Sequence, residues 1–445
     1  MNTPHDFSNG MNRRHFLKAT SIAGGALIGG LGIERSAHAA GSDTLKLALI
    51  GCGGRGSGAA NQALNAAGVN VKLVAMADAF PDRLESSLEN LKTAFPDKVE
   101  VPKEHQFTGF DAYKKAIALA DVVILSTPPG FRPIHFEEAV KQGKHIFMEK
   151  PVATDAPGVR RVLAAAEEAK KKNLKVGVGL QRRHQTGYIE TMERLHEGAI
   201  GDIVSMRAYW NGNTPWVKQR ADLEKQAGRK LTEMEYQMRN WYYFAWICGD
   251  HICEQHIHNL DVINWMKRGH PVRARGNGGC ETRKGADYGE IFDHHVVEFE
   301  YEDGSVCFSQ CRHQLGCWNE VAEYAIGSKG RVHMDDGHWK IIGANEWKFG
   351  GKQARERYQQ EHDDLFAAIR DDKPYNEAEY GATSTMTAIL GRMSTYSGTS
   401  IEWDDAINSK ISLMPKEFSW DADMPVKPME NGLYHLPIPG KTVVV

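Results

Sequence analysis

The chain has 445 residues, of which 41% are hydrophobic and 25% are charged, and this length suits two globular domains that each bury a core. A formal net charge of −3 with no basic cluster excludes nucleic acid and anionic membranes from the expected partners. No apolar run reaches the length of about 20 residues that a transmembrane helix needs, so we expect no membrane insertion of the mature protein.

Residues 1–39 have the features of an export leader. Arg13 and Arg14 lie in a basic stretch, a Gly/Ala-rich apolar run follows over residues 19–33, and residues 37–39 form a small-x-small cleavage site. Paired arginines ahead of such a run predict a twin-arginine signal, which exports proteins that have already folded. The twin-arginine translocase is therefore an expected partner, and the periplasm is the expected location.

The next segment predicts a dinucleotide-binding domain. A buried strand over residues 45–50 runs directly into a glycine turn, and a helix is expected over residues 59–67. The first glycine permits the tight turn, the second lets the backbone approach a pyrophosphate, and the last allows close packing of helix on strand. The helix N-terminus then faces the phosphates. The predicted cofactor-binding residues of this turn are Gly51, Gly53, Gly54, Arg55 and Gly56.

Further strands of this domain end in polar residues. The strand over residues 71–76 leads to Asp78, whose carboxylate at this spacing accepts both ribose hydroxyls and repels a 2′-phosphate, so NAD is expected rather than NADP. Later strands over residues 121–127 and 145–148 are expected to end at the same crevice. The predicted cofactor contacts there are Thr127, Pro128, Glu149 and Lys150. His135 begins a predicted helix, where it either contacts substrate or caps the helix.

At Glu149-Lys-Pro151 the chain resembles the Gfo/Idh/MocA oxidoreductases, and the resemblance extends over essentially all of the sequence after the leader. The order and spacing of several motifs carry it: the glycine turn, Thr127-Pro128, Glu-Lys-Pro, residues 179–183 and 198–201, His258-x-x-Asp261-x-x-x-Trp265, and residues 376–379. The resemblance implies an α/β protein with a Rossmann domain, here residues 44–175. A second α/β domain, residues 176–445, would carry a large, mostly antiparallel open sheet that often forms a homo-oligomer interface.

The residues of the second half support this architecture independently. Strands are predicted over residues 293–301, 305–310 and 323–326, and helices over residues 354–370 and 378–396. The C-terminal helices are expected to pack back on the Rossmann domain. A charged segment, residues 218–230, is expected to be a surface loop over the cleft.

The densest polar cluster lies between residues 249 and 261. If this segment is one helix, His251, Glu254 and His258 share a face. The resemblance implies that His258 is the base that takes a proton from a sugar hydroxyl, with Lys150 on the same oxygen and Glu254 orienting the site. His256 replaces the usual glycine of this motif. Two alternatives remain for the face: a solvated surface, or a metal site formed by His251, Glu254 and His258.

The substrate pocket is predicted from the residues around these groups. Arg183 matches an arginine that commonly follows the next strand in this family, and its two predecessors are expected beside it. The aromatic run at residues 241–246 either belongs to the core or stacks on a sugar. The predicted substrate contacts are Arg183, Arg182, Gln181, His251, His135 and Tyr242.

Together the features predict an exported NAD-dependent oxidoreductase that acts on a sugar or glycoside hydroxyl with a tightly retained cofactor. Because the periplasm holds no pool of free NAD, the reduced cofactor must be reoxidised in place. A second carbonyl substrate does this in glucose–fructose oxidoreductases of the family. The alternative is a glycosidase that oxidises, eliminates the aglycone and reduces the sugar again; the best known of these depart from Glu-Lys-Pro at the lysine, so Lys150 favours the oxidoreductase. A third hypothesis is a non-catalytic sugar sensor.

Overall fold

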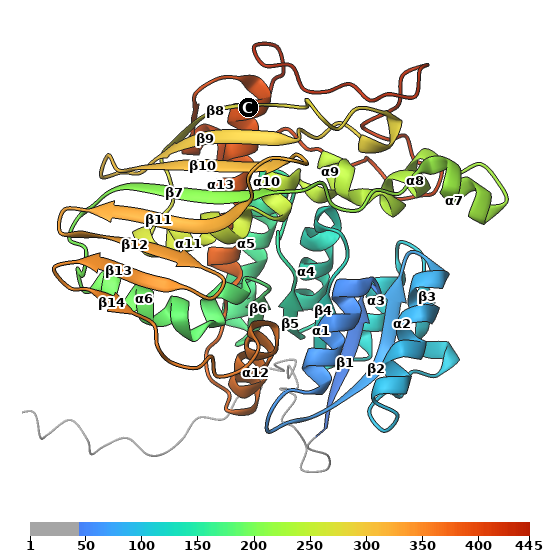
Figure 1. The fold of residues 1–445 in the computed structure, drawn as a ribbon. Helices are drawn as coiled ribbons and strands as arrows, with labels where there is room; N and C mark the ends of the chain where they lie inside the picture. The colour runs from blue at the N-terminus through green and yellow to red at the C-terminus, as the bar shows by residue number, and fades with distance from the viewer. Residues whose placement is uncertain (1–43) are drawn as a thin grey trace, which may run out of the picture. The chain divides into compact units, whose positions relative to one another are not determined.

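Two sheets organise residues 44–445, which are the residues that the computed structural model describes (Figure 1). The predicted leader, residues 1–39, lies outside the described residues. The first sheet is parallel throughout and has the order β3-β2-β1-β4-β5-β6. Its strands are β1 (Thr44–Ile50), β2 (Asn70–Asp78), β3 (Gln106–Thr108), β4 (Val122–Leu125), β5 (His145–Met148) and β6 (Val176–Val178).

Helices connect the strands of this sheet, as a parallel sheet requires. They are α1 (Gly54–Leu64), α2 (Pro81–Ala94), α3 (Ala112–Ala118), α4 (Arg132–Lys141) and α5 (Ala156–Lys171). Strand order reverses between β1 and β4, which is where doubly wound sheets bind ligands. The four residues of β4 are buried on both faces, which explains why these strands could be recognised as continuous apolar runs.

The second sheet has nine strands in the order β14-β13-β12-β11-β7-β10-β9-β8-β15. Only the β7–β10 pair is parallel, so the predicted mostly antiparallel sheet is confirmed. Its strands are β7 (Ile203–Gly212), β8 (Arg273–Gly279), β9 (His294–Glu300), β10 (Val306–His313), β11 (Glu320–Gly327), β12 (Gly330–Asp335), β13 (Trp339–Gly343), β14 (Trp347–Lys348) and β15 (Ile401–Glu402).

Helices of the second half pack on the inner face of this sheet and on the first domain. Helix α13 (Ala378–Ser397) contacts both β8 and α5, and α12 (Arg357–Arg370) contacts α1. The remaining helices are α6 (Thr186–His196), α7 (Arg220–Ala227), α8 (Glu233–Arg239), α9 (Ala245–Cys248), α10 (His251–Glu254), α11 (Ile257–Lys267) and α14 (Trp403–Asn408). None of the helices in residues 44–445 is long and apolar enough to cross a bilayer.

Two sequence expectations differ from the structure. The first helix begins at Gly54, inside the glycine turn, because the turn itself supplies the first helical residues. The segment predicted as a loop at 218–230 contains α7, a polar surface helix with no buried residue, which ends at Gly228 in the left-handed region. β6 belongs to the first sheet although it follows the predicted boundary at residue 175, and the boundary itself stays a prediction.

Candidate active site

A cavity of about 680 Å³ opens at the carboxyl ends of the first sheet and is closed by residues from the second half of the chain. It brings together most of the predicted site. The predicted residues that line it are Gly51, Gly53, Gly54, Arg55, Gly56, Asp78, Thr127, Pro128, His135, Glu149, Lys150, Gln181, Glu254 and His258. The cofactor turn and the predicted catalytic residues therefore share one space.

The glycine turn is built for close contacts on one side and open space on the other. Gly51 has a φ of +94°, and a Cβ there would lie 2.4 Å from the Thr127 backbone nitrogen. A Cβ on Gly56 would lie 1.9 Å from the Gly51 carbonyl oxygen. By contrast, a Cβ on Gly53 or Gly54 would meet no described atom within 4 Å. The open backbone at the N-terminus of α1 fits the pyrophosphate of a dinucleotide.

Asp78 ends β2 at the wall of this cavity. Its carboxylate accepts the Cys52 backbone N–H at 2.7 Å on one oxygen and the Phe80 N–H at 2.9 Å on the other. Burial raises the pKa of Asp78, and these two N–H groups oppose that rise. Each oxygen keeps a second acceptor site, so the carboxylate can still receive ribose hydroxyls.

Two charged pairs flank the end of β5. The Lys150 ammonium lies 3.1 Å from Glu254 Oε1 and also donates to the Glu254 backbone carbonyl, with both side chains mostly buried. The preceding residue, Glu149, lies 2.6 Å from Arg55 Nε of the glycine turn. Lys150 thus faces the cavity from a fixed position, and Glu254 of the predicted catalytic motif holds it there.

His258 lies in the first turn of α11 and is buried, with its ring stacked on Trp210 at 5.9 Å between centroids. Its Nδ1 has no hydrogen-bond partner among residues 44–445. Burial lowers the pKa of His258 well below its usual range, and the positive charge of Lys150 lowers it further. A neutral imidazole beside a fixed ammonium is the state that a general base requires.

The motif is not one helix, because α10 ends at Glu254 and α11 begins at Ile257. The break separates His258 from His251 and Glu254. Glu254 and His258 line the cavity, whereas His251 does not. His256, at the break, turns to the second sheet and lies 2.7 Å from the Ser309 hydroxyl.

The two predicted substrate arginines bind internal acids. Arg183 forms a forked pair with Asp261 at 2.9–3.1 Å and lies over the Tyr380 ring. Arg182 pairs with the buried Glu323. Neither guanidinium lines the cavity, whereas the preceding Gln181 does. Their substrate role therefore stays a prediction, with no support from their position.

Tyr242 and His135 lie close to the site in different ways. Tyr242 is buried, and burial together with the negative charge of Glu254 raises its pKa. It is absent from the cavity wall. His135 reaches the wall, where its Nδ1 lies 3.2 Å from the Thr127 hydroxyl. Burial lowers the pKa of His135 to about 3, so this ring is neutral and holds Thr127 in place.

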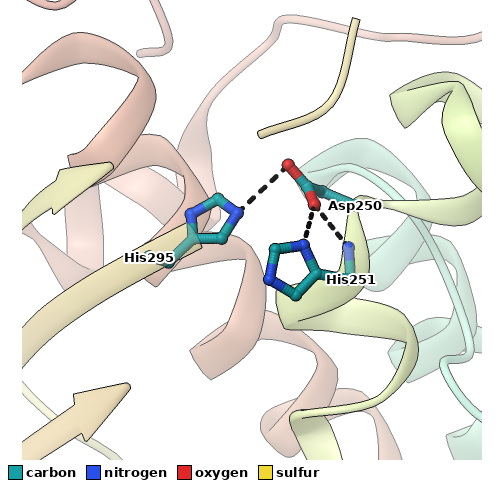
Figure 2. Close-up of side chains that lie close together, drawn as sticks. All are labelled: Asp250, His251 and His295. Atoms are coloured by element: carbon teal, nitrogen blue, oxygen red, sulfur yellow. Dashed lines mark hydrogen bonds and ion pairs between the residues drawn. The ribbon is translucent and has the colours of Figure 1, made fainter. Parts of the chain in front are cut away.

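His251 belongs to a different cluster from the predicted metal set. Within residues 44–445, potential metal ligands of Asp250, His251 and His295 lie within 4.8 Å of one another (Figure 2). The Asp250 carboxylate accepts hydrogen bonds from His251 Nδ1 at 2.8 Å and from the Tyr396 hydroxyl at 2.7 Å. It also lies 3.2 Å from His295 Nε2. Burial raises the pKa of Asp250, but the two histidines outweigh burial and hold it well below its usual range. The three residues therefore form a buried hydrogen-bonded cluster at the N-terminus of α10.

Sequence reasoning missed several residues of the cavity wall. Arg132 is fully buried and donates to the carbonyls of Leu125 and Thr127 at 2.8 Å, which fixes the end of β4. No local pattern marks it. Among the others are aromatic and polar residues of later segments: Trp210, Trp216, Trp241, Gln255 and Tyr358. For Trp241 the aromatic run was the available signal.

The fold and the cavity define a two-domain α/β protein whose dinucleotide-binding sheet faces a buried histidine and lysine. Residues 45–179 match the model of the GFO_IDH_MocA family, described as an oxidoreductase family with an NAD-binding Rossmann fold. The first domain is therefore similar to the NAD-binding Rossmann domain of this family.

Similar proteins include enzymes of sugar chemistry. A glycosyl hydrolase family 109 protein of Shewanella pealeana is 27% identical over 231 residues, 48% of each chain. An inositol 2-dehydrogenase of Gluconacetobacter diazotrophicus is 28% identical over 167 residues, 37% of this chain and 41% of that one. The chain spans about half the length of the first curated relatives that it matches.

The solved structures extend the likeness to the whole fold. An aldose-aldose oxidoreductase from Caulobacter crescentus, complexed with glycerol, has a TM-score of 0.63 at 17% identity. The alignment covers 81% of this chain and 99% of that one. At this identity the likeness establishes the shared fold of both domains.

Proposed function

We propose that this protein is an NAD-dependent oxidoreductase that acts on a hydroxyl of a sugar or glycoside. The observation that carries the proposal is the single cavity in which the open glycine turn faces Lys150 and the buried, neutral His258. Relatives named for inositol oxidation and glycoside hydrolysis support a polyhydroxylated substrate.

Each residue has a distinct task in this proposal. His258 takes the proton from the substrate hydroxyl, because its lowered pKa keeps the imidazole neutral. Lys150 donates a hydrogen bond to the same oxygen and stabilises negative charge on it, while Glu254 fixes the ammonium through its carboxylate and its backbone carbonyl. Bound NAD supplies the hydride acceptor.

We also propose that the cofactor stays bound through the reaction and that the protein is exported to the periplasm by its twin-arginine leader. A packed aromatic wall supports retention. Phe80 and Phe110 line the cavity beside Asp78, and the C-terminal Trp420 packs on both rings at 5.3 and 4.7 Å between centroids. Phe418 packs on Phe131 of the same wall at 5.2 Å.

Replacing Trp420 with alanine is expected to raise the rate of NAD release about tenfold, because the ring contacts that hold this wall in place, each worth roughly 1 kcal/mol, are lost. The bound cofactor is first reduced to NADH. The protein is then diluted rapidly, and the change in NADH fluorescence gives the rate of release. Trp403→Ala is the matched control, since Trp403 stacks on His270 at 3.8 Å and lies outside the cavity wall. Equal release from both variants would contradict the role of the C-terminal segment.

The glycosidase alternative rests on the glycosyl hydrolase relative, and one experiment separates it from the oxidoreductase. Cofactor-loaded protein is incubated in heavy water with a panel of chromogenic glycosides and no added acceptor. A keto-sugar that forms only when a carbonyl acceptor is added supports the oxidoreductase. Aglycone release with deuterium beside the anomeric carbon makes the protein a glycosidase. Sugar binding without any turnover makes it a sensor.

We further propose a homo-oligomer formed through the outer face of the second sheet. Strand register puts Val296, Phe308 and Ile326 on this face, and each is about half exposed. Apolar side chains gathered on one sheet face are typical of subunit contacts.

A further inference from the structure

Two tryptophans at the cavity wall have no role in the proposed catalytic steps. Trp216 follows β7 and Trp241 precedes α9, and their rings pack edge to face at 5.9 Å between centroids. Trp216 also packs edge-on against Tyr242 at 6.0 Å. Trp216 nevertheless remains 43% exposed although it lines the cavity.

The exposure of Trp216 does not come from a loose loop. The Tyr243 hydroxyl donates to the backbone carbonyls of Pro215 and Trp216 at 3.2 and 3.1 Å. Asn240 accepts the Lys218 backbone N–H at 2.8 Å. Both Tyr243 and Asn240 are fully buried, so the chain on either side of Trp216 is anchored to the core. The backbone that carries the ring is therefore held in place, and part of the ring surface remains exposed.

We infer that Trp216 and Trp241 form a stacking subsite for the second ring of a glycoside, which deepens the proposed function and rests on it. The ring to be oxidised must reach Lys150 and His258, and this pair lines the same cavity from the segments after β7 and before α9. Indole faces bind the apolar C–H face of a pyranose or the face of an aromatic aglycone, and a rigid ring loses little entropy on binding. The preferred substrate class is thus a glycoside rather than a free monosaccharide.

The test measures binding to NAD-loaded protein by titration calorimetry. The glycone that gives turnover in the chromogenic panel is offered as its methyl glycoside, as a disaccharide and as its 4-nitrophenyl glycoside. In Trp216→Ala the Kd of the two-ring ligands is expected to rise about tenfold, the loss of one aromatic stacking contact. The methyl glycoside, which lacks the second ring, should change much less, so the preference for two rings falls. Trp216→Phe should restore part of it.

Trp318→Ala is the matched control, because Trp318 is 54% exposed, lies over Arg312 and is outside the cavity wall. The disaccharide and nitrophenyl arms distinguish a sugar from an aromatic aglycone as the stacked ring. An unchanged preference for two rings in Trp216→Ala, or a loss of NAD instead of glycoside affinity, overturns the subsite and leaves the proposed function standing. If the wild-type protein binds none of the sugars, the proposed function fails together with the subsite.

Discussion

Replacing His258 with alanine is expected to lower kcat by about 10²–10⁴-fold while NAD binding is retained. The magnitude is that of losing a positioned general base, and the buried ring has no described hydrogen-bond partner on Nδ1 that its removal would orphan. Turnover and bound-cofactor content are measured on the same preparation. His256→Ala is the matched control, since that histidine is two residues away and equally buried but binds Ser309 rather than lining the cavity.

The pH profile gives a readout that structural damage would not imitate. Because the base must be neutral, kcat/KM falls as pH drops through the pKa of His258. Burial and the Lys150 charge lower that pKa, so the acid limb should lie below about 6.5, the usual value for histidine. Lys150→Met removes the largest of the charges that lower this pKa, so its residual activity should show an acid limb moved to higher pH. Full activity in His258→Ala, or an acid limb at the same pH in Lys150→Met as in the wild type, would contradict the assignment of His258 as the base.

The centre of the first sheet was predictable because β4 and the end of β1, residues 47–50, are fully buried and appear in the sequence as apolar runs. The short β3 has no buried residue and was not predicted. The second sheet was predicted only in part. Strand β8 has the sequence RARGNGG, which has few apolar residues, and it is held as a strand by its pairing with β9 and by packing under α13. Such tertiary support leaves no local pattern.

The candidate site shows the same division. The glycine turn, Lys150 and His258 follow from local motifs, and the structure brings them to one cavity. The partners of Arg182 and Arg183 lie 141 and 78 residues away, so no spacing rule could assign them. Helical periodicity could not relate His258 to His251 and Glu254, because the chain breaks between α10 and α11. His251 turns instead to Asp250, the residue before it.

The two open glycines and the two closed glycines of the turn should respond to alanine in opposite ways. In Gly56→Ala the new methyl group meets a backbone carbonyl at 1.9 Å, so α1 must move away from β1. Forcing atoms into a packed contact of this kind typically costs about 1–3 kcal/mol. We expect the melting temperature to fall by several degrees with or without NAD.

In Gly53→Ala the methyl group meets no described protein atom within 4 Å, and a φ of −73° suits alanine, so the protein without cofactor should melt like the wild type. The methyl group instead occupies the space through which the pyrophosphate approaches the backbone. NAD affinity should therefore fall by at least about tenfold, and the stabilisation that NAD gives should shrink accordingly. Melting curves of cofactor-stripped protein at increasing NAD concentration measure both quantities. Wild-type NAD affinity in Gly53→Ala would mean that the dinucleotide does not cross this turn.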